Sequence, residues 1–232
     1  MQVPSGVHQL PVSDAGRMRT PVLYLHGFAS SPESTKARYF AERLAAHRVT
    51  LTTPDFNQPD FRTLTMSRML SQLGDRIDEV GGRAVLMGSS LGGALAILGA
   101  AQYAGAVDRL VLLAPAVMLA KPGHSLLPPE RMAEWKHRGA LPFFHYAWNE
   151  ERLLDYAFYE DSLRHDPFDA QFAQPTLIFQ GLRDTVVYPQ PVEAFAAARP
   201  NVTLSLLDDD HQLAASLPRM WESVEEFLGL LD

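Results

Sequence analysis

The stretch from residue 85 to residue 93 constrains the fold of this chain more than any other. An apolar, strand-like run leads into Gly88-Ser89-Ser90-Leu91-Gly92, and the apolar residues 94–98 continue as the start of a helix. Gly-x-Ser-x-Gly in this context is typical of a serine held at the tip of a strained strand-to-helix turn. A positive φ angle at the serine crowds the backbone around it, which favours glycine at Gly88 and Gly92. The pattern predicts Ser90 as a nucleophile beside the first amides of a helix, with a plain turn as the alternative.

Strand-like and helix-like segments alternate around this turn. Apolar runs predict strands at residues 21–25, 49–53, 85–87, 110–114, 176–180 and 202–207, after a short leading strand at residues 6–12. Apolar residues at helical spacing predict helices over residues 35–47 with Ser34 as N-cap, over 66–80, from 91 onward, over 190–198, and along a final stripe from Leu217 to Leu231. Fully apolar strands are typical of a parallel sheet covered on both faces. The sequence therefore predicts one doubly wound, mostly parallel α/β domain over residues 1–232.

Residues 116–169 interrupt this alternation. A proline-rich start leads into a segment rich in tryptophan, phenylalanine and tyrosine, which is too aromatic for a solvated linker. We expect a small cap or lid insertion here, and an ordinary helix packed on the core is the alternative. The aromatic side chains would line a substrate pocket or form the core of the cap itself.

A serine nucleophile needs a base, and the base needs a carboxylate that orients it. Asp184 and His211 each follow a predicted strand, and the carboxyl ends of parallel strands meet at one edge of a sheet. Ser90, Asp184 and His211 are thus expected to converge, although Asp184 has a turn-capping role as its alternative. The neighbouring acidic residues 208–210 are interpreted as a solvated capping loop rather than as metal ligands.

The order serine, acid, histidine, together with His26-Gly27-Phe28 after the first confident strand, resembles the serine hydrolases of the α/β-hydrolase superfamily. The compact length and the start Leu-His-Gly-Phe-Ala-Ser-Ser are similar to small bacterial carboxylesterases. The resemblance implies an oxyanion hole formed by the backbone amides of Phe28 and Leu91. It also implies a structural role for His26, which braces the oxyanion loop, and a reaction without a cofactor.

The resemblance implies a serine esterase acting on a small-molecule carboxylic ester with a short to medium acyl group. Ser90 would form the acyl-enzyme, His211 would act as base and Asp184 as orienting acid. Thioester or acyl-glucuronide hydrolysis would use the same groups. A non-catalytic small-molecule-binding module on the same fold is the alternative of a different class.

Charge and composition narrow the partners. The 232 residues carry 20 basic and 27 acidic side chains, a net charge of −7, which disfavours nucleic acid and anionic membranes. No apolar run reaches the roughly 20 residues of a membrane span, and the absence of cysteine excludes disulfides and thiolate metal sites. The first 20 residues lack the apolar core of a signal peptide, so we expect a cytoplasmic protein. The histidines of residues 116–169 lack the spacing of metal ligands, so we expect no metal site. A homodimer through exposed aromatics stays open.

Overall fold

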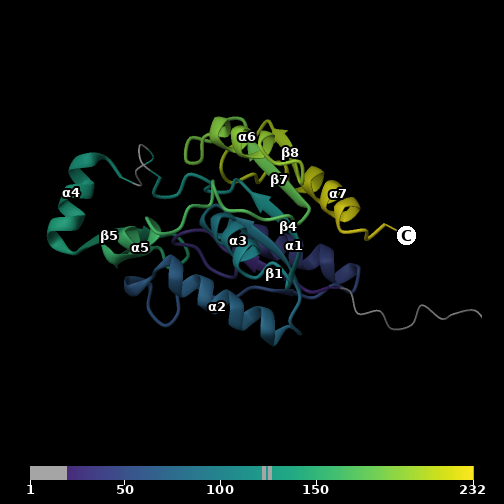
Figure 1. Cartoon of the computed structure of the whole chain (residues 1–232), viewed down its shortest axis with the longest axis horizontal. Coiled ribbons are helices and arrows are strands. Elements are labelled where there is room, and N and C mark those ends of the chain that lie inside the picture. Colours follow the sequence, from purple (N-terminus) through teal and green to yellow (C-terminus); the bar gives the residue numbers. More distant parts are fainter. Residues whose placement is uncertain (1–19, 122–123, 125–126, 232) are drawn as a thin grey trace, which may run out of the picture.

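A single parallel sheet organises the fold (Figure 1). The computed structural model describes residues 20–121, 124 and 127–231, so the leading strand expected at residues 6–12 lies outside the described part. Across the sheet the strands lie in the order β2 (Leu51–Thr52), β1 (Val22–Leu25), β3 (Ala84–Ser89), β4 (Val107–Leu113), β7 (Thr176–Gly181) and β8 (Val202–Leu207). All neighbouring pairs in this order are parallel, so the six carboxyl ends share one edge.

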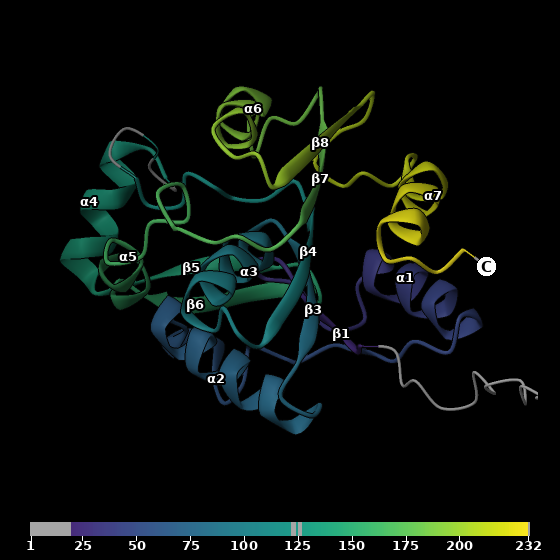
Figure 2. The same cartoon turned by 45° about the vertical axis from the view of Figure 1, so that its right-hand side comes forward.

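Helices cover both faces of the sheet, as Figure 2 shows. One face packs against α1 (Thr35–Ala46) and α7 (Leu217–Phe227), and the other against α2 (Met66–Glu79), α3 (Leu91–Gln102) and α6 (Pro189–Ala197). Alternate residues of β1 enter the two cores: Val22 and Tyr24 join the first, Leu23 and Leu25 the second. Strands buried on both faces have no polar side, which explains their continuous apolar sequences. The predicted doubly wound α/β architecture is confirmed.

Local signals place the helix starts. The Ser34 side chain accepts a hydrogen bond from the amide of Ala37 at 3.3 Å, so the expected N-cap of α1 is present. Thr65 caps α2 in the same way, accepting from the amide of Arg68 at 3.1 Å. In each case the side-chain oxygen satisfies one of the amides that a helix leaves without an acceptor in its first turn.

The final helix is shorter than the apolar stripe predicted. α7 ends at Phe227, and Gly229 has a positive φ of 64°, which stops the helical path. Leu230 still packs into the core at 4% exposure, whereas Leu231 is 61% exposed. The extension of the stripe to Leu231 was therefore wrong, because the chain turns at Gly229 in a backbone conformation that only glycine adopts easily.

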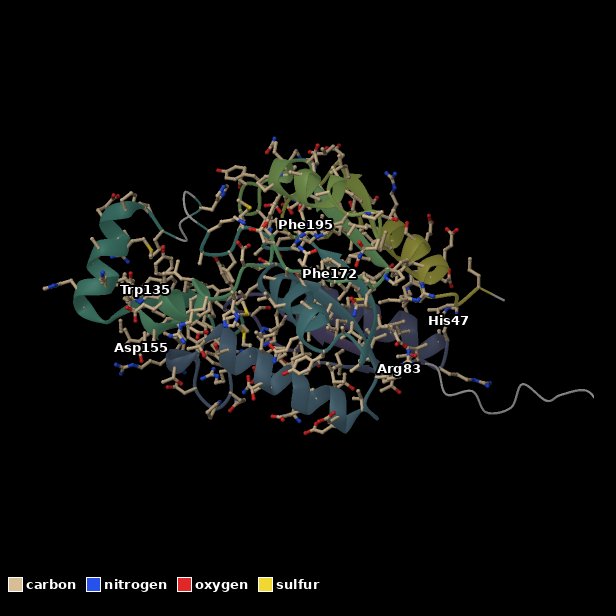
Figure 3. The ribbon with its side chains drawn as sticks, viewed as in Figure 1. His47, Arg83, Trp135, Asp155, Phe172 and Phe195 are labelled. Carbon is tan, nitrogen blue, oxygen red and sulfur yellow. The ribbon has the colours of Figure 1, made fainter. Side chains whose placement is uncertain are left out.

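The inserted segment (residues 116–169) builds structure of its own. It contains α4 (Pro129–Arg138), the antiparallel hairpin of β5 (Ala140–His145) and β6 (Glu150–Asp155), and α5 (Ala157–Ser162). Trp135 is fully buried, and its Nε1 donates to the carbonyl of Leu154 at 2.8 Å. Figure 3 shows Trp135 and Asp155 on the left of the molecule and Arg83, the residue before β3, right of its centre. The segment contacts the loop after β1, because the amide of Tyr146 donates to the carbonyl of Ala29.

Candidate active site

Ser90 lies at the sharp turn between β3 and α3, where the sequence predicted it. Its backbone has φ 53° and ψ −114°, a strained conformation that any residue other than glycine rarely adopts. The turn is held from both sides, because the Ser90 amide donates to the carbonyl of Leu113 at 2.9 Å and its own carbonyl accepts from the amide of Ala116 at 3.0 Å. Strain at this position is thus supported by the surrounding sheet, as is typical of functional turns.

The two glycines of the motif are required by close backbone packing. A Cβ atom added at Gly88 would lie 2.2 Å from the carbonyl oxygen of Gly92. One added at Gly92 would lie 2.0 Å from the carbonyl oxygen of Leu25, at the end of β1. Both distances are far inside van der Waals contact, so α3 can begin against β3 and β1 only where side chains are absent.

Asp184 and His211 form a direct pair. His211 Nδ1 lies 2.8 Å from Asp184 Oδ2, and the aspartate side chain is completely buried. Gln180 Nε2 donates to the same oxygen at 3.1 Å, and the amides of Val186 and Val187 donate to Oδ1, each at 2.8 Å. The carboxylate is therefore anchored on β7 and the turn after it, and it accepts four hydrogen bonds.

This environment keeps Asp184 ionised. Burial alone would raise its pKa, but the hydrogen bonds from His211 and from the amides of Val187 and Val186 outweigh burial and leave the pKa below its usual value. An ionised carboxylate only accepts hydrogen bonds, so Nδ1 of His211 carries a proton. In the neutral ring Nε2 is then an acceptor, the form that a general base needs.

Ser90 and His211 line the same cavity, which has a volume of about 860 Å³. Its lining residues come from β1 and the loop after it, from the start of α1, from the turn before α3, from the inserted segment and from the loop of His211. The lining residues with hydroxyl groups are Tyr24, Ser30, Ser31, Ser34, Thr35, Ser89, Ser90 and Tyr146. A smaller cavity of about 460 Å³ between residues 57–62 and 148–153 contains none of Ser90, Asp184 or His211.

The loop after β1 borders this cavity and is braced from behind. Gly27 and Phe28 line the cavity, while His26 is buried at 6% exposure. His26 Nδ1 lies 2.9 Å from the carbonyl of Gly27, and Nε2 accepts from the amide of Phe56 at 3.1 Å. Because both ring nitrogens have backbone partners, the geometry favours the bracing role that was expected for His26.

Of the two residues whose backbone amides were expected to bind an oxyanion, Phe28 lines the same cavity and Leu91 directly follows Ser90. Leu91 is the first residue of α3, and helix geometry gives the first amides of a helix no acceptor within the helix. Gly27 and Phe28 line the cavity together with Ser90. The positive end of α3 therefore begins directly after Ser90.

The hairpin of the inserted segment is tied to the loop after β1. The amide of Tyr146 donates to the carbonyl of Ala29 at 2.9 Å. Asn57 bridges the two parts, because its Nδ2 donates to the carbonyl of Ser30 at 2.9 Å and its Oδ1 lies 3.3 Å from Nε2 of the buried His145. Shifts of the hairpin would thus be passed to the backbone beside the cavity.

The structure divides the aromatic residues that the sequence left undivided. Tyr146 is the aromatic residue of the inserted segment that lines the cavity, and it is 74% exposed. Trp135, Phe143 and Phe158 pack instead: Phe143 contacts Trp135 and Phe28, and Phe158 contacts Phe28. These aromatic rings therefore stabilise the joint between the segment and the loop after β1.

One expectation for the acidic loop was wrong. Asp209 is buried at 5% exposure, and its Oδ2 accepts from the amide of Ser216 at 2.9 Å. Asp208, by contrast, is exposed and pairs with Arg183. Within a run of three aspartates the sequence offers no signal for which one is buried, because that depends on how the loop returns to α7.

Sequence reasoning also missed Lys36, which lines the cavity from the first turn of α1. Its Nζ donates to the carbonyl of Gln212, the residue after His211, at 3.1 Å. A lone lysine on an amphipathic helix carries no signal of such a contact in the sequence.

Within residues 20–121, 124 and 127–231, no group of three or more histidine, cysteine or acidic side chains is arranged to hold a metal ion. Among the helices of those same residues, none has the length and apolarity needed to cross a membrane.

Solved structures share this architecture along almost the whole chain. Est1E from Butyrivibrio proteoclasticus, solved with bound ferulic acid, is 22% identical, with a TM-score of 0.79 over 93% of this chain and 90% of that chain. Alpha/beta hydrolase domain-containing protein 10 from mouse is 21% identical, with a TM-score of 0.77 over 93% and 92%. A monoacylglycerol lipase from Paleococcus ferrophilus is 15% identical, with a TM-score of 0.73 over 91% and 96%. These similarities show the α/β-hydrolase fold.

The sequence comparison with families points to one group. No curated protein matches the sequence. The model of the uncharacterised protein family UPF0227 matches residues 21–228, which include Ser90, Asp184 and His211. Because this match spans nearly all of the chain, the protein belongs to the UPF0227 family and has the α/β-hydrolase fold.

Proposed function

We propose that this protein is a serine hydrolase that cleaves carboxylic esters through an acyl-enzyme on Ser90. The observation that carries the proposal is the pair of Asp184 and His211 in front of the cavity that contains Ser90. A buried carboxylate with four donors orients a histidine at some cost in desolvation. A module that only binds a small molecule has no need for this arrangement next to a strained serine.

In the proposed reaction, Nε2 of His211 takes the proton of the Ser90 hydroxyl while Oγ attacks the ester carbonyl carbon. The amides of Leu91 and Phe28 would donate to the carbonyl oxygen as it becomes an oxyanion. The protonated His211 then gives its proton to the leaving alcohol as the C–O bond breaks. Water, activated by His211, attacks the acyl-enzyme and releases the acid.

The proposed substrates are esters with short to medium acyl groups. The cavity lining combines serine, threonine and tyrosine residues with apolar ones, and most aromatic rings of the inserted segment pack elsewhere. Few aromatic rings are therefore left to enclose a long alkyl chain. Thioesters and acyl-glucuronides would be cleaved by the same groups and are the closest alternative substrates.

The inserted segment forms the cap in this proposal, within a single domain that spans residues 1–232. It reaches the cavity through Tyr146 and Ala147 and contacts the loop after β1 through its hairpin. Its role would be to shape one side of the entrance and to hold Phe28 in place by packing.

The experiment that tests this function is hydrolysis of p-nitrophenyl esters from acetate to palmitate by the wild type and by Ser90→Ala. We expect turnover that is highest for short acyl chains, and a loss of about 10⁴-fold or more in kcat in the variant. Ser71→Ala, an exposed serine on α2, is the matched control.

Labelling with a fluorophosphonate separates the remaining readings. Labelled Ser90 without ester turnover would direct the search to thioesters and acyl-glucuronides. Folded wild-type protein that neither turns over esters nor becomes labelled would refute the hydrolase and favour a binding module. Turnover that survives Ser90→Ala would place the nucleophile elsewhere.

A further inference from the structure

We propose that Lys36 is a positioning residue for His211: it tethers the loop that carries the base to α1 and holds a positive charge beside it. The proposal rests on the hydrolase function proposed above, because it assigns His211 the role of base. It adds a residue from an element that is remote in sequence from the serine, the acid and the histidine.

The contact joins two distant parts of the chain. Lys36 lies in the first turn of α1, and its Nζ donates to the carbonyl of Gln212 at 3.1 Å, 176 residues away. Gln212 follows His211 directly, so the tether acts on the backbone next to the base. Lys36, Ser90, His211 and Gln212 all line the same cavity, which places the tether at the candidate site.

The loop is also held by the turn after β7. His211 pairs with Asp184, and the amide of Arg183 donates to the carbonyl of Asp209 at 3.0 Å. These contacts lie before Gln212 in the chain or at His211 itself. Leu213 has a positive φ of 56°, so the chain turns sharply two residues after the base. The hydrogen bond from Lys36 therefore adds a tie to α1 at the residue between His211 and this turn.

A lysine is energetically unfavourable at this position. The first turn of a helix is its positive end, where a cation is disfavoured. Burial lowers the pKa of Lys36 to about 8, and the carboxylates of Asp184, Asp210 and Asp209 oppose this lowering. At neutral pH the ammonium is still mostly protonated. The contact of Lys36 with the loop of His211 offers a reason for a lysine at this unfavourable position.

Lys36 also places a positive charge at the cavity that His211 lines. In general, a cation near an imidazole disfavours the protonated ring. Several other titratable groups line the cavity or interact with the charge of Lys36. They are Asp184 after β7, Asp209, Asp210 and His211 after β8, Tyr24 on β1, Glu33 just before α1 and Arg38 in α1. The net effect of removing Lys36 alone is one positive charge fewer beside the base.

The test compares Lys36→Met and Lys36→Arg with the wild type. The methionine keeps the aliphatic bulk and removes the donor and the charge, while the arginine keeps both. Lys136→Met, an exposed lysine on α4, is the matched control for the substitution itself. Two quantities are measured: kcat/KM for p-nitrophenyl acetate from pH 5 to 9, and the titration of the His211 ring by NMR. Thermal unfolding verifies that each variant is folded.

We expect Lys36→Met to lose about 10-fold or more in kcat/KM. We also expect the acid side of its pH–activity profile (its acid limb) and the His211 titration to move to higher pH, because the positive charge that disfavours the protonated ring is gone. Lys36→Arg should stay within about threefold of the wild type, with an unshifted acid limb, and Lys136→Met should match the wild type.

Wild-type kcat/KM and an unchanged titration in folded Lys36→Met would overturn the proposal while leaving the hydrolase intact. An equal loss in Lys36→Met and Lys36→Arg, without a shift of the titration, would also overturn it, since the lysine would then be needed only for packing. The NMR titration is independent of turnover. A wild type without esterase activity or labelling would refute the proposed function, and the titration would still decide whether Lys36 acts on His211.

Discussion

Gly92→Ala tests whether the start of α3 is fixed by backbone packing against β1. In a helix, replacing glycine by alanine normally stabilises by up to about 1 kcal/mol, so the substitution would be favourable if space allowed it. Here the added Cβ would lie 2.0 Å from the carbonyl oxygen and 2.5 Å from the carbonyl carbon of Leu25, and 2.7 Å from the carbonyl oxygen of His26. The first of these is a full ångström inside the 3.0 Å that real Cβ atoms keep. Backbone atoms cannot rotate away as a side chain can, so α3 or the end of β1 must shift.

The cost of such overpacking is typically about 1–3 kcal/mol, which reverses the sign expected from helix propensity. We expect Gly92→Ala to lose about 2 kcal/mol in the free energy of unfolding, or roughly 4–8 °C in Tm for a chain of this size. Urea unfolding and a thermal scan measure this. Gly105→Ala is the matched control, because no atom lies within 4 Å of the Cβ it would add, and it should stay within about 0.5 kcal/mol of the wild type.

The same variant has a functional readout. Leu25 and His26 lead directly into Gly27 and Phe28, so a displaced strand end moves the loop that borders the cavity. We expect the kcat for a short ester to fall together with the stability. A Gly92→Ala protein as stable as the wild type would refute the reasoning, because it would mean that the close approach of α3 to β1 does not require glycine.

Two further predictions concern titratable groups. Asp184→Asn keeps an acceptor for the amides of Val186 and Val187 but removes the charge that fixes the proton on Nδ1 of His211. We therefore expect kcat for a short ester to fall by about 10³–10⁴-fold, while the circular dichroism spectrum stays that of a folded protein. A loss below tenfold would contradict the role of Asp184. Burial, followed by the charge of His26, lowers the pKa of His145 below its usual 6.5. The unfolded chain then takes up a proton that the folded chain resists, so the free energy of unfolding should fall as the pH drops below about 6.5. In urea titrations between pH 7.5 and 5, His145→Phe should show a weaker fall than the wild type. The same dependence of the unfolding free energy on pH in both proteins would refute this assignment.

Several elements of the fold follow from local sequence. Strand β8 has the predicted bounds Val202–Leu207, and α1 begins after the predicted N-cap Ser34, because apolar runs and capping side chains act within a few residues. The end of α7 was missed for the opposite reason. An apolar stripe continues past Gly229, and only the backbone conformation there shows that the helix has already stopped.

The candidate site could be predicted because its chemistry is written in short motifs at strand ends. Ser90, Asp184 and His211 each follow a strand, and the parallel order of β3, β7 and β8 brings their loops to one edge of the sheet. The convergence of Asp184 and His211 was expected from this rule together with the resemblance to serine hydrolases, and the two side chains form a direct pair. Strand position helps because a parallel sheet brings residues at its strand ends close together.

The lining of the cavity, the burial of Asp209 and the contact of Lys36 with Gln212 were decided by the tertiary structure alone. Each depends on which of several similar side chains faces inward when segments far apart in the sequence meet. Composition could say that residues 116–169 are aromatic, but not that Trp135 and Phe143 pack on each other while Tyr146 borders the cavity. The sequence by itself therefore determined the order of strands, helices and chemical groups along the chain. The packing of the inserted segment and of α1 against the strand ends decided the shape and charge of the space between them, because those contacts have no local signature.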